Sequence, residues 1–152
     1  MQTVEQLLSQ KGRDVWTVSP DDSVYDAVDL MSERNIGAVL VCQGEEVRGI
    51  LSERDCVRRV MLRGRAARET RVAEAMSSAV RAVSPHDTVD YCMQQMTDKR
   101  VRHLPVLDDD GVLVGMISVG DVVKAQLSEQ ENLISGLESY IHGSSASVRP
   151  PA

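Results

Sequence analysis

The sequence predicts an α/β (α+β) fold in which two copies of one helix–strand–strand–helix unit pack together. The first observation is a repeat at an offset of 65 residues, since VSPDDSV (residues 18–24) aligns with VSPHDTV (residues 83–89). The second is that GILSERD (residues 49–55) matches GMISVGD (residues 115–121) after a one-residue difference in a turn. One small sheet with two helices cannot bury its apolar face alone, so we expect the two copies to associate.

The first helix of each copy follows a turn sequence, Ser-Pro-Asp-Asp or Ser-Pro-His-Asp. Ser23 and Thr88 stand where a helix N-cap belongs. Apolar residues then recur at i, i+3, i+4 and i+7, which predicts one buried stripe on a surface helix. The stripes are Val24, Ala27, Val28 and Met31 in the first copy, and Val89, Cys92, Met93 and Met96 in the second.

Two short strands and a second helix complete each copy. We expect strands at residues 38–41 and 47–51, and at 103–106 and 113–117, each pair joined by a polar turn. The second helices begin near Ser52 and Ser118. Their apolar residues are Val57 and Val60 in the first copy, and Val122, Val123 and Leu127 in the second.

The flanking segments extend this plan. Residues 3–10 are predicted to form a short helix, and residues 121–141 one long helix. We therefore divide the chain into an N-terminal helix and lead-in (1–12), a first repeat (13–66), a second repeat (67–128), a C-terminal helix extension (129–142) and a tail (143–152). The Ser-, Gly- and Pro-rich tail is predicted to be disordered.

Composition excludes several classes of protein. The chain has no Phe, one Trp, three Tyr and a net charge of −6, which argues against a nucleic-acid binder that needs aromatic platforms or a basic surface. It has no apolar run of membrane-spanning length and no signal peptide, so we expect no membrane association and a cytoplasmic location. Cys42, Cys56 and Cys92 form no CxxC pair, and we expect all three to be small buried residues rather than zinc ligands or disulfides.

The paired motifs resemble a known family. Two copies of a Pro-Asp/His-Asp-Ser/Thr-Val start, each closing with Gly-x-x-Ser-x-x-Asp, are similar to a tandem CBS (cystathionine β-synthase) pair, or Bateman module, over nearly the whole chain. GILSERD, KRVRHLPV (residues 99–106) and the long last helix resemble stand-alone bacterial CBS-pair proteins. The resemblance implies two pseudo-symmetric repeats packed sheet to sheet, with two clefts that bind AMP, ADP, ATP, S-adenosylmethionine or NAD(H), and a homodimer.

The Ser-x-x-Asp pairs are the strongest candidates for ligand contacts. A carboxylate at Asp55 or Asp121 can accept hydrogen bonds from both ribose hydroxyls. The hydroxyls of Ser52 and Ser118, with free amides of the first helical turn, can meet a phosphate. The alternative is that each pair only caps its helix. Their occurrence as a matched pair favours ribose binding.

The resemblance extends the candidate site to residues of the opposite repeat and the lead-in. Arg54 and Arg102 are the phosphate candidates, because a guanidinium donates in a planar fork. A surface salt bridge remains an equal alternative for Arg102, and a structural role is favoured for His103. The implied ligand-binding residues are Lys11, Gly12, Trp16, Ile36, Gly37, Ala38, Ile50, Ser52, Arg54, Asp55, Met76, Val101, Arg102, His103, Met116, Ser118 and Asp121.

The two predicted clefts are not equivalent. Glu53 and Arg54 stand between Ser and Asp in the first motif, against Val119 and Gly120 in the second, so the first is better equipped for phosphates and one cleft could take a larger ligand such as NAD(H). Seven arginines lie within residues 54–71; a nucleic-acid patch is conceivable, but we favour a solvated helix face with one or two turned toward phosphate.

No catalytic motif is present: the sequence contains no GxGxxG, Walker loop, HExxH or GxSxG. We expect a regulatory module that binds an adenine nucleotide, needs no catalytic cofactor or metal, and acts on an unidentified protein partner through a ligand-dependent change of its dimer. The alternative is a structural dimerisation module with no physiological small ligand.

Overall fold

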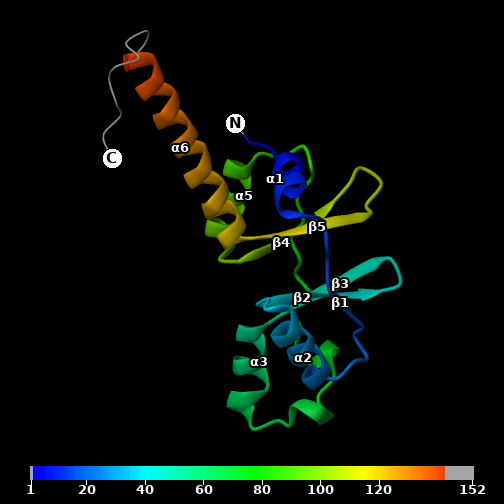
Figure 1. Ribbon diagram of the computed structural model, residues 1–152. Helices are drawn as coiled ribbons and strands as arrows, with labels where there is room; N and C mark the ends of the chain where they lie inside the picture. Colours follow the sequence, from blue (N-terminus) through cyan, green and yellow to red (C-terminus); the bar gives the residue numbers. More distant parts are fainter. Residues whose placement is uncertain (1, 143–152) are drawn as a thin grey trace.

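The computed structural model describes residues 2–142, and the predicted disordered tail lies outside them. Each repeat is built as the sequence predicts, from a helix, two strands and a second helix (Figure 1). The elements are α1 (Val4–Lys11), β1 (Thr17–Val18), α2 (Val24–Arg34), β2 (Ala38–Gln43), β3 (Glu46–Ser52), α3 (Glu53–Arg59), the 3₁₀ turns η1 (Met61–Arg63) and η2 (Ala67–Glu69), α4 (Val72–Ala75), α5 (Val89–Lys99), β4 (His103–Leu107), β5 (Leu113–Ser118) and α6 (Val119–His142).

The two sheets lie back to back in the middle of the molecule. β2 and β3 pair antiparallel in one sheet, and β4 and β5 in the other. β1 adds to β2 in parallel, a strand that the sequence did not predict; its counterpart in the second repeat is a single bridge between Val83 and Val106. Figure 1 shows α2 and α3 beyond one sheet and α1 and α5 beyond the other, so the expected sheet-to-sheet packing is confirmed.

The helix caps follow the sequence pattern. The hydroxyls of Ser23 and Thr88 accept hydrogen bonds from the amides of Asp26 and Tyr91, at 3.0 and 3.1 Å. Each of these helices ends in a residue with left-handed backbone, Asn35 in α2 and Arg100 in α5, both at φ 54°. The left-handed residue turns the chain from the helix into the following strand.

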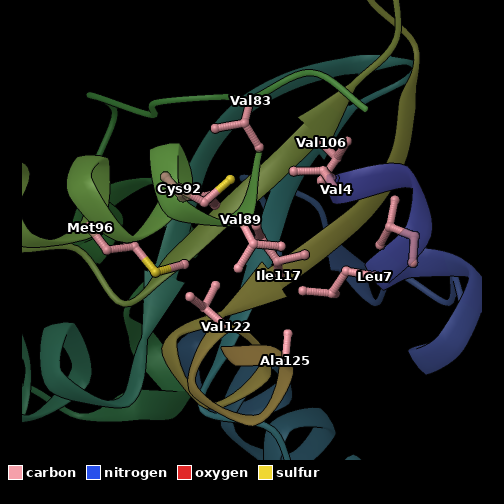
Figure 2. Close-up of a cluster of buried hydrophobic side chains, with 12 residues drawn as sticks. Val4, Leu7, Val83, Val89, Cys92, Met96, Val106, Ile117, Val122 and Ala125 are labelled. Carbon is pink, nitrogen blue, oxygen red and sulfur yellow. The ribbon is translucent and has the colours of Figure 1, made fainter. Parts of the chain in front are cut away.

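The core of each repeat includes a short helix that lies ahead of the first capped helix of the other repeat, α1 ahead of α2 and α4 ahead of α5. Val4, Leu7 and Leu8 of α1 are buried in the core of the second repeat (Figure 2). Val72 and Ala75 of α4 are buried in the core of the first. The segment that carries α1 therefore belongs to the core of the second repeat, and the segment that carries α4 to the core of the first. Together the two segments tie the two sheets together.

The glycine of each Gly-x-x-Ser-x-x-Asp motif lies under one of these crossing segments. A Cβ at Gly49 would come within 2.7 Å of the carbonyl oxygen of Ser77, and the neighbouring Ile50 exchanges backbone hydrogen bonds of 3.0 and 2.9 Å with Ser77. At Gly115 a Cβ would come within 2.7 Å of Leu8 Cδ2. Glycine is needed because another segment approaches the strand closely.

Some predicted burial is wrong. Val28 is 39% exposed, so the buried stripe of α2 consists of Val24, Ala27 and Met31. Cys42 is only half-buried. Cys56 and Cys92 are buried as expected, and burial raises the pKa of their thiols to about 11 and about 12.

Candidate functional site

Both Ser-x-x-Asp pairs form capping boxes. Asp55 Oδ2 accepts from the Ser52 amide at 3.0 Å, while the Ser52 hydroxyl accepts from the Asp55 amide at 3.1 Å. Ser118 and Asp121 repeat this exchange at 2.8 and 3.2 Å. The observed hydrogen bonds therefore agree with the interpretation that each pair caps its helix. It does not exclude ligand binding, because Asp55 Oδ1 accepts no hydrogen bond from any described residue.

The first-turn amides are less available than the sequence suggested. The Glu53 amide donates to the Gly37 carbonyl at 3.0 Å, and the Val119 amide donates to the Arg102 carbonyl at 2.9 Å. The amides of Asp55 and Asp121 are engaged in the capping boxes. A phosphate in either cleft would therefore depend mainly on side-chain donors.

Asp55 lies in a cavity of about 590 Å³, which we call the Asp55 cleft. This volume falls in the range of about 300–1,000 Å³ that small-molecule sites occupy. The opposite repeat supplies part of its wall, as the resemblance implies. The expected residues that line it are Gly37, Ile50, Ser52, Arg54 and Asp55 from the first repeat, and Val101, Arg102 and His103 from the second.

Arginines dominate the charge of the Asp55 cleft, with Glu53 and Asp55 as its carboxylates. Four of them belong to residues 54–71, more than the one or two that we expected to face a ligand. The remaining three come from the segment before α5 and from the end of α5 onward. The set is Arg54, Arg58, Arg59, Arg63, Arg81, Arg100 and Arg102.

Asp121 lies in a second cavity of about 140 Å³, the Asp121 cleft, which is smaller than typical ligand sites. Lys11 Nζ donates to Asp121 Oδ2 at 2.7 Å and to the Met116 carbonyl at 2.7 Å. Partial burial would raise the pKa of Asp121, but hydrogen bonds from Lys11 and Ser118 outweigh it and lower that pKa. The other expected residues that line this cavity are Trp16, Ile36, Ala38, His103 and Ser118.

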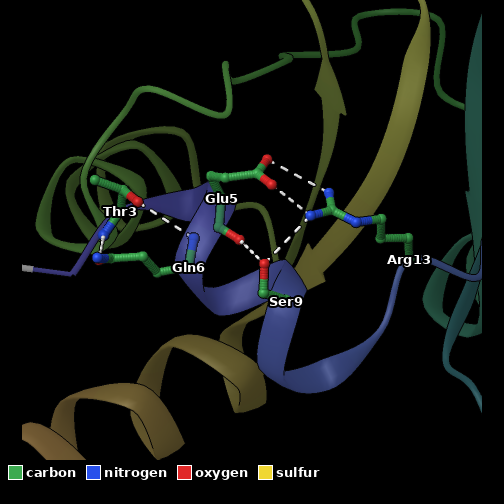
Figure 3. Close-up of polar contacts among 5 residues, drawn as sticks. All are labelled: Thr3, Glu5, Gln6, Ser9 and Arg13. Carbon is green, nitrogen blue, oxygen red and sulfur yellow. Dashed lines mark hydrogen bonds and ion pairs between the residues drawn. The ribbon is translucent and has the colours of Figure 1, made fainter.

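The end of α1 is held so that Lys11 reaches this cleft. Thr3 and Gln6 form a capping box at the start of α1 (Figure 3). The guanidinium of Arg13 folds back and donates to the carboxylate of Glu5, and its Nη2 also donates to the hydroxyl of Ser9 at 3.3 Å. Gly12 has φ 103°, a conformation that favours glycine, and its amide donates to the Leu8 carbonyl at 2.8 Å. These contacts anchor the turn that carries Lys11.

His103 lies between the two cavities and lines both. It is half-buried, and burial lowers the pKa of its imidazole. A Cβ at Gly37 would lie 3.9 Å from His103 Cε1, so the two repeats meet closely at this point. On the side of the Asp121 cleft, the guanidinium of Arg34 lies 4.0 Å from the centre of the Trp16 ring.

Two expected ligand residues line neither cleft. Gly12 forms the turn after α1, and Met76 packs with the first-repeat core against Gly49.

Sequence reasoning also missed several residues of the Asp55 cleft. Two of them could have been found from the sequence. The repeat offset maps Trp16 onto Arg81, and the i, i+4 spacing places Arg58 beside Arg54. The missed residues are Glu53, Arg58, Arg59, Arg63, Ser77, Ala79, Val80, Arg81 and Arg100.

Neither a metal centre nor a membrane span is apparent in the part of the chain that the structure describes. Residues 2–142 bring no three His, Cys, Asp or Glu side chains together as a metal would require. Among the same residues, every helix is too short or too polar to cross a bilayer.

Comparisons with known proteins agree with this architecture of two repeats. The CBS domain model matches twice, at residues 4–62 and 72–128. The chain is 38% identical over 151 residues to the mitochondrial CBS domain-containing protein CBSX3 of Arabidopsis thaliana, covering 93% of this chain and 72% of that one. It is 33% identical over 128 residues to the CBS domain-containing protein YhcV of Bacillus subtilis, covering 84% and 89%.

The fold also matches solved structures. A protein with CBS domains from Burkholderia ambifaria MC40-6 superposes with a TM-score of 0.82 at 48% identity, covering 85% of this chain and 96% of that one. The chain therefore belongs to the CBS-domain family as a tandem pair of repeats.

Proposed function

We propose that the chain binds an adenine nucleotide in the Asp55 cleft and acts as a regulatory module without catalysis. The observation that carries this proposal is the free Oδ1 of Asp55 in a cavity of nucleoside size built by both repeats. A carboxylate in that position can accept hydrogen bonds from the two hydroxyls of a ribose. The Asp121 cleft, at about 140 Å³, is too small for the same ligand, and Lys11 Nζ lines it as the ion-pair partner of Asp121 Oδ2.

The other residues of the Asp55 cleft suit the remaining parts of a nucleotide. Ile50 and Val101 offer apolar surface to the base, and Gly37 keeps the backbone accessible. Arg54 and Arg102 come from opposite repeats, and both can donate to phosphate oxygens. A nucleotide held in this way would contact both repeats at once.

A ligand that bridges two repeats favours one relative arrangement of their sheets, and regulation would follow by population shift. Arg102 offers a direct route to the long helix, because its carbonyl accepts the hydrogen bond from the first residue of α6, Val119.

We further propose that the chain forms a homodimer through exposed apolar side chains. Val57 on α3 is 44% exposed, and Val123 and Leu127 on α6 are 41% and 55% exposed. A large apolar surface that is left open on one chain commonly marks a protein interface.

Isothermal titration calorimetry with AMP, ATP and NADH tests the nucleotide proposal. Asp55→Asn keeps an oxygen that can accept from the Ser52 amide, so the capping box survives while the charge is lost. We expect about 10- to 100-fold weaker binding, because hydrogen bonds to a charged acceptor contribute about 1.5–3 kcal/mol of binding free energy. Asp121→Asn is the matched control and should change affinity little.

Absence of binding at millimolar concentrations of all three compounds would overturn the nucleotide proposal. If the chain is nevertheless a dimer, the second candidate function, a structural dimerisation module, is favoured. The exposed apolar residues of α3 and α6 are the observation that supports this second candidate.

A further inference from the structure

We propose that the Asp55 cleft selects a nucleoside triphosphate over the monophosphate, an inference that rests on the proposed nucleotide site. It concerns the number of phosphates, which the ribose and base contacts of that site do not determine. The argument starts from the arginines that line the cavity and from what their side chains contact.

Most of these arginine side chains have no partner among residues 2–142. Arg59 donates to the carbonyl of Met76 at 2.7 Å, and Arg81 donates to Gln95 Oε1 at 2.9 Å. The side chains of the other five make no hydrogen bond, ion pair or ring contact with any described residue. These five, which we call the free arginines, are Arg54, Arg58, Arg63, Arg100 and Arg102.

Arginines elsewhere in residues 2–142 behave differently, because every one of them has a partner. Four pair with carboxylates, and two stack on aromatic rings. The pairs are Arg13 with Glu5, Arg48 with Glu46, Arg65 with Glu74, Arg71 with Asp21, Arg34 with Trp16 and Arg68 with Tyr25. The unpaired cations are therefore concentrated in the one cavity that also holds the free Asp55 oxygen.

The backbone at Arg100 supports a role for its side chain. Arg100 occupies a left-handed conformation at φ 54°, where Asn35 stands at the equivalent position of the first repeat. Asparagine and glycine tolerate this conformation better than arginine does. A side chain that is kept at an unfavourable backbone position points to a use for its functional group.

The distribution of the free arginines favours a chain of phosphates. Arg54 and Arg58 are four residues apart on α3, about 6 Å along the helix axis. Arg63 follows in η1, and Arg100 and Arg102 line the cavity from the other repeat. A single phosphate offers three strong acceptor oxygens, fewer than the five guanidinium groups of the free arginines. The positive charges of the free arginines repel one another. Each additional phosphate adds negative charge and acceptor oxygens that offset this repulsion.

The test compares ATP, ADP, AMP and inorganic tripolyphosphate by calorimetry at constant ionic strength. We expect ATP to bind at least about tenfold more tightly than AMP, with ADP between them. Tripolyphosphate should bind more weakly than ATP, because it lacks the ribose that Asp55 contacts.

Arg100→Asn and Arg58→Gln together should lower ATP affinity at least about tenfold and change AMP affinity by less than about threefold. Arg100→Asn copies the residue of the first repeat, so the variant should melt no lower than the wild type. Arg48→Gln removes an arginine outside the cavity and should leave ATP affinity unchanged.

Equal affinity for ATP and AMP, or an equal loss of both in the variant, would overturn the inference and leave the proposed nucleotide site intact. Tripolyphosphate binding as tightly as ATP would instead contradict the proposed nucleotide site, since the adenosine would then contribute nothing. Failure of every nucleotide to bind would likewise overturn the proposed function itself.

Discussion

Lys11 and Asp121 form an ion pair with 2.7 Å between Nζ and Oδ2, joining the last residue of α1 to the first turn of α6. The equivalent carboxylate of the first repeat, Asp55, has no such partner among residues 2–142. Two motifs that match in sequence therefore lie in different electrostatic surroundings. The protein supplies its own cation to one motif and leaves the other open to a ligand.

Removal of the Lys11 side chain should open the Asp121 cleft. If the nucleotide proposal holds, the wild type binds one nucleotide per chain and Lys11→Ala binds a second, more weakly, because Asp121 is then free. The variant should also lose about 0.5–1.5 kcal/mol of stability, since the ion pair is partly exposed and Lys11 also donates to the Met116 carbonyl. Calorimetric stoichiometry and urea unfolding measure the two effects.

Lys124→Ala is the matched control for Lys11→Ala, because it removes a lysine from an exposed position on α6. Lys124→Ala should change neither the number of nucleotides bound per chain nor the free energy of unfolding. A single binding site in Lys11→Ala, or two equal sites in the wild type, would contradict the role of the ion pair.

His103 should make stability depend on pH below 6.5. Burial lowers the pKa of its imidazole from the usual 6.5, against an opposing effect of Asp121. In the window between the lowered pKa and 6.5, the unfolded chain binds more protons than the folded one, so stability falls as the pH falls. The loss is about 1.4 kcal/mol for each pKa unit by which folding lowers this pKa.

The measurement is urea unfolding at pH 7.5, 6.5 and 5.5. His103→Gln should flatten the profile relative to the wild type. His86→Gln, at an exposed turn position, should leave the slope unchanged. An identical slope in wild type and His103→Gln would show that another group causes the dependence.

Local signals predicted most of the fold. α2 and α5 follow from a turn, a capping Ser23 or Thr88 and an apolar period of 3.6 residues, all of which lie within one stretch of chain. β1 was missed because its two residues become a strand only by pairing with β2, more than twenty residues away. The periodicity of α2 could not show that Val28 faces outward, since burial of a helix edge depends on what packs there.

The candidate site was predicted best where the repeat or the resemblance carried it. Ser52, Asp55 and their counterparts could be found because both copies contain them. Arg54 and Arg102 were expected as well. Arg59, Arg63 and Arg100 could not be, because α3, η1 and the end of α5 face one cavity only after the repeats pack. The contact between Lys11 and Asp121 spans 110 residues of chain and depends on α1 joining the core of the second repeat.

The two motif glycines should differ in their tolerance of alanine. At Gly49 the new methyl group would meet a backbone carbonyl at 2.7 Å and Met76 Sδ at 2.8 Å, and the strand there is bridged to Ser77. At Gly115 its nearest neighbours would be atoms of the Leu8 side chain, with Cδ2 at 2.7 Å and Cδ1 at 2.9 Å. We expect Gly49→Ala to lose about 2–3 kcal/mol, and Gly115→Ala closer to about 1 kcal/mol, because a side chain can move where a backbone bridge cannot.

Urea unfolding of both glycine variants measures this difference. Gly44→Ala is a third variant with open space at its Cβ but φ 61°, and it separates backbone strain from crowding. Equal losses at Gly49 and Gly115, or a larger loss at Gly115, would show that the crossing segment at Gly49 is not rigid.

The exposed side of α6 should carry part of the dimer contact. Leu127, Ile134 and Ile141 are spaced by seven residues and are 55%, 55% and 73% exposed, and Leu137 lies between them at 52%. A seven-residue apolar period is the pattern by which helices associate with a second helix. Ile134→Glu should therefore weaken dimerisation at least about tenfold, because the charge would have to be buried.

The folded monomer should tolerate Ile134→Glu to within about 0.5 kcal/mol, since the side chain is already exposed. Asn132→Glu adds the same charge to the other side of α6 and should leave dimerisation unchanged. Sedimentation equilibrium across a range of concentrations measures both variants. If Ile134→Glu and the wild type dissociate at the same concentration, any dimer forms without α6, and the apolar residues of α3 become the candidate contact.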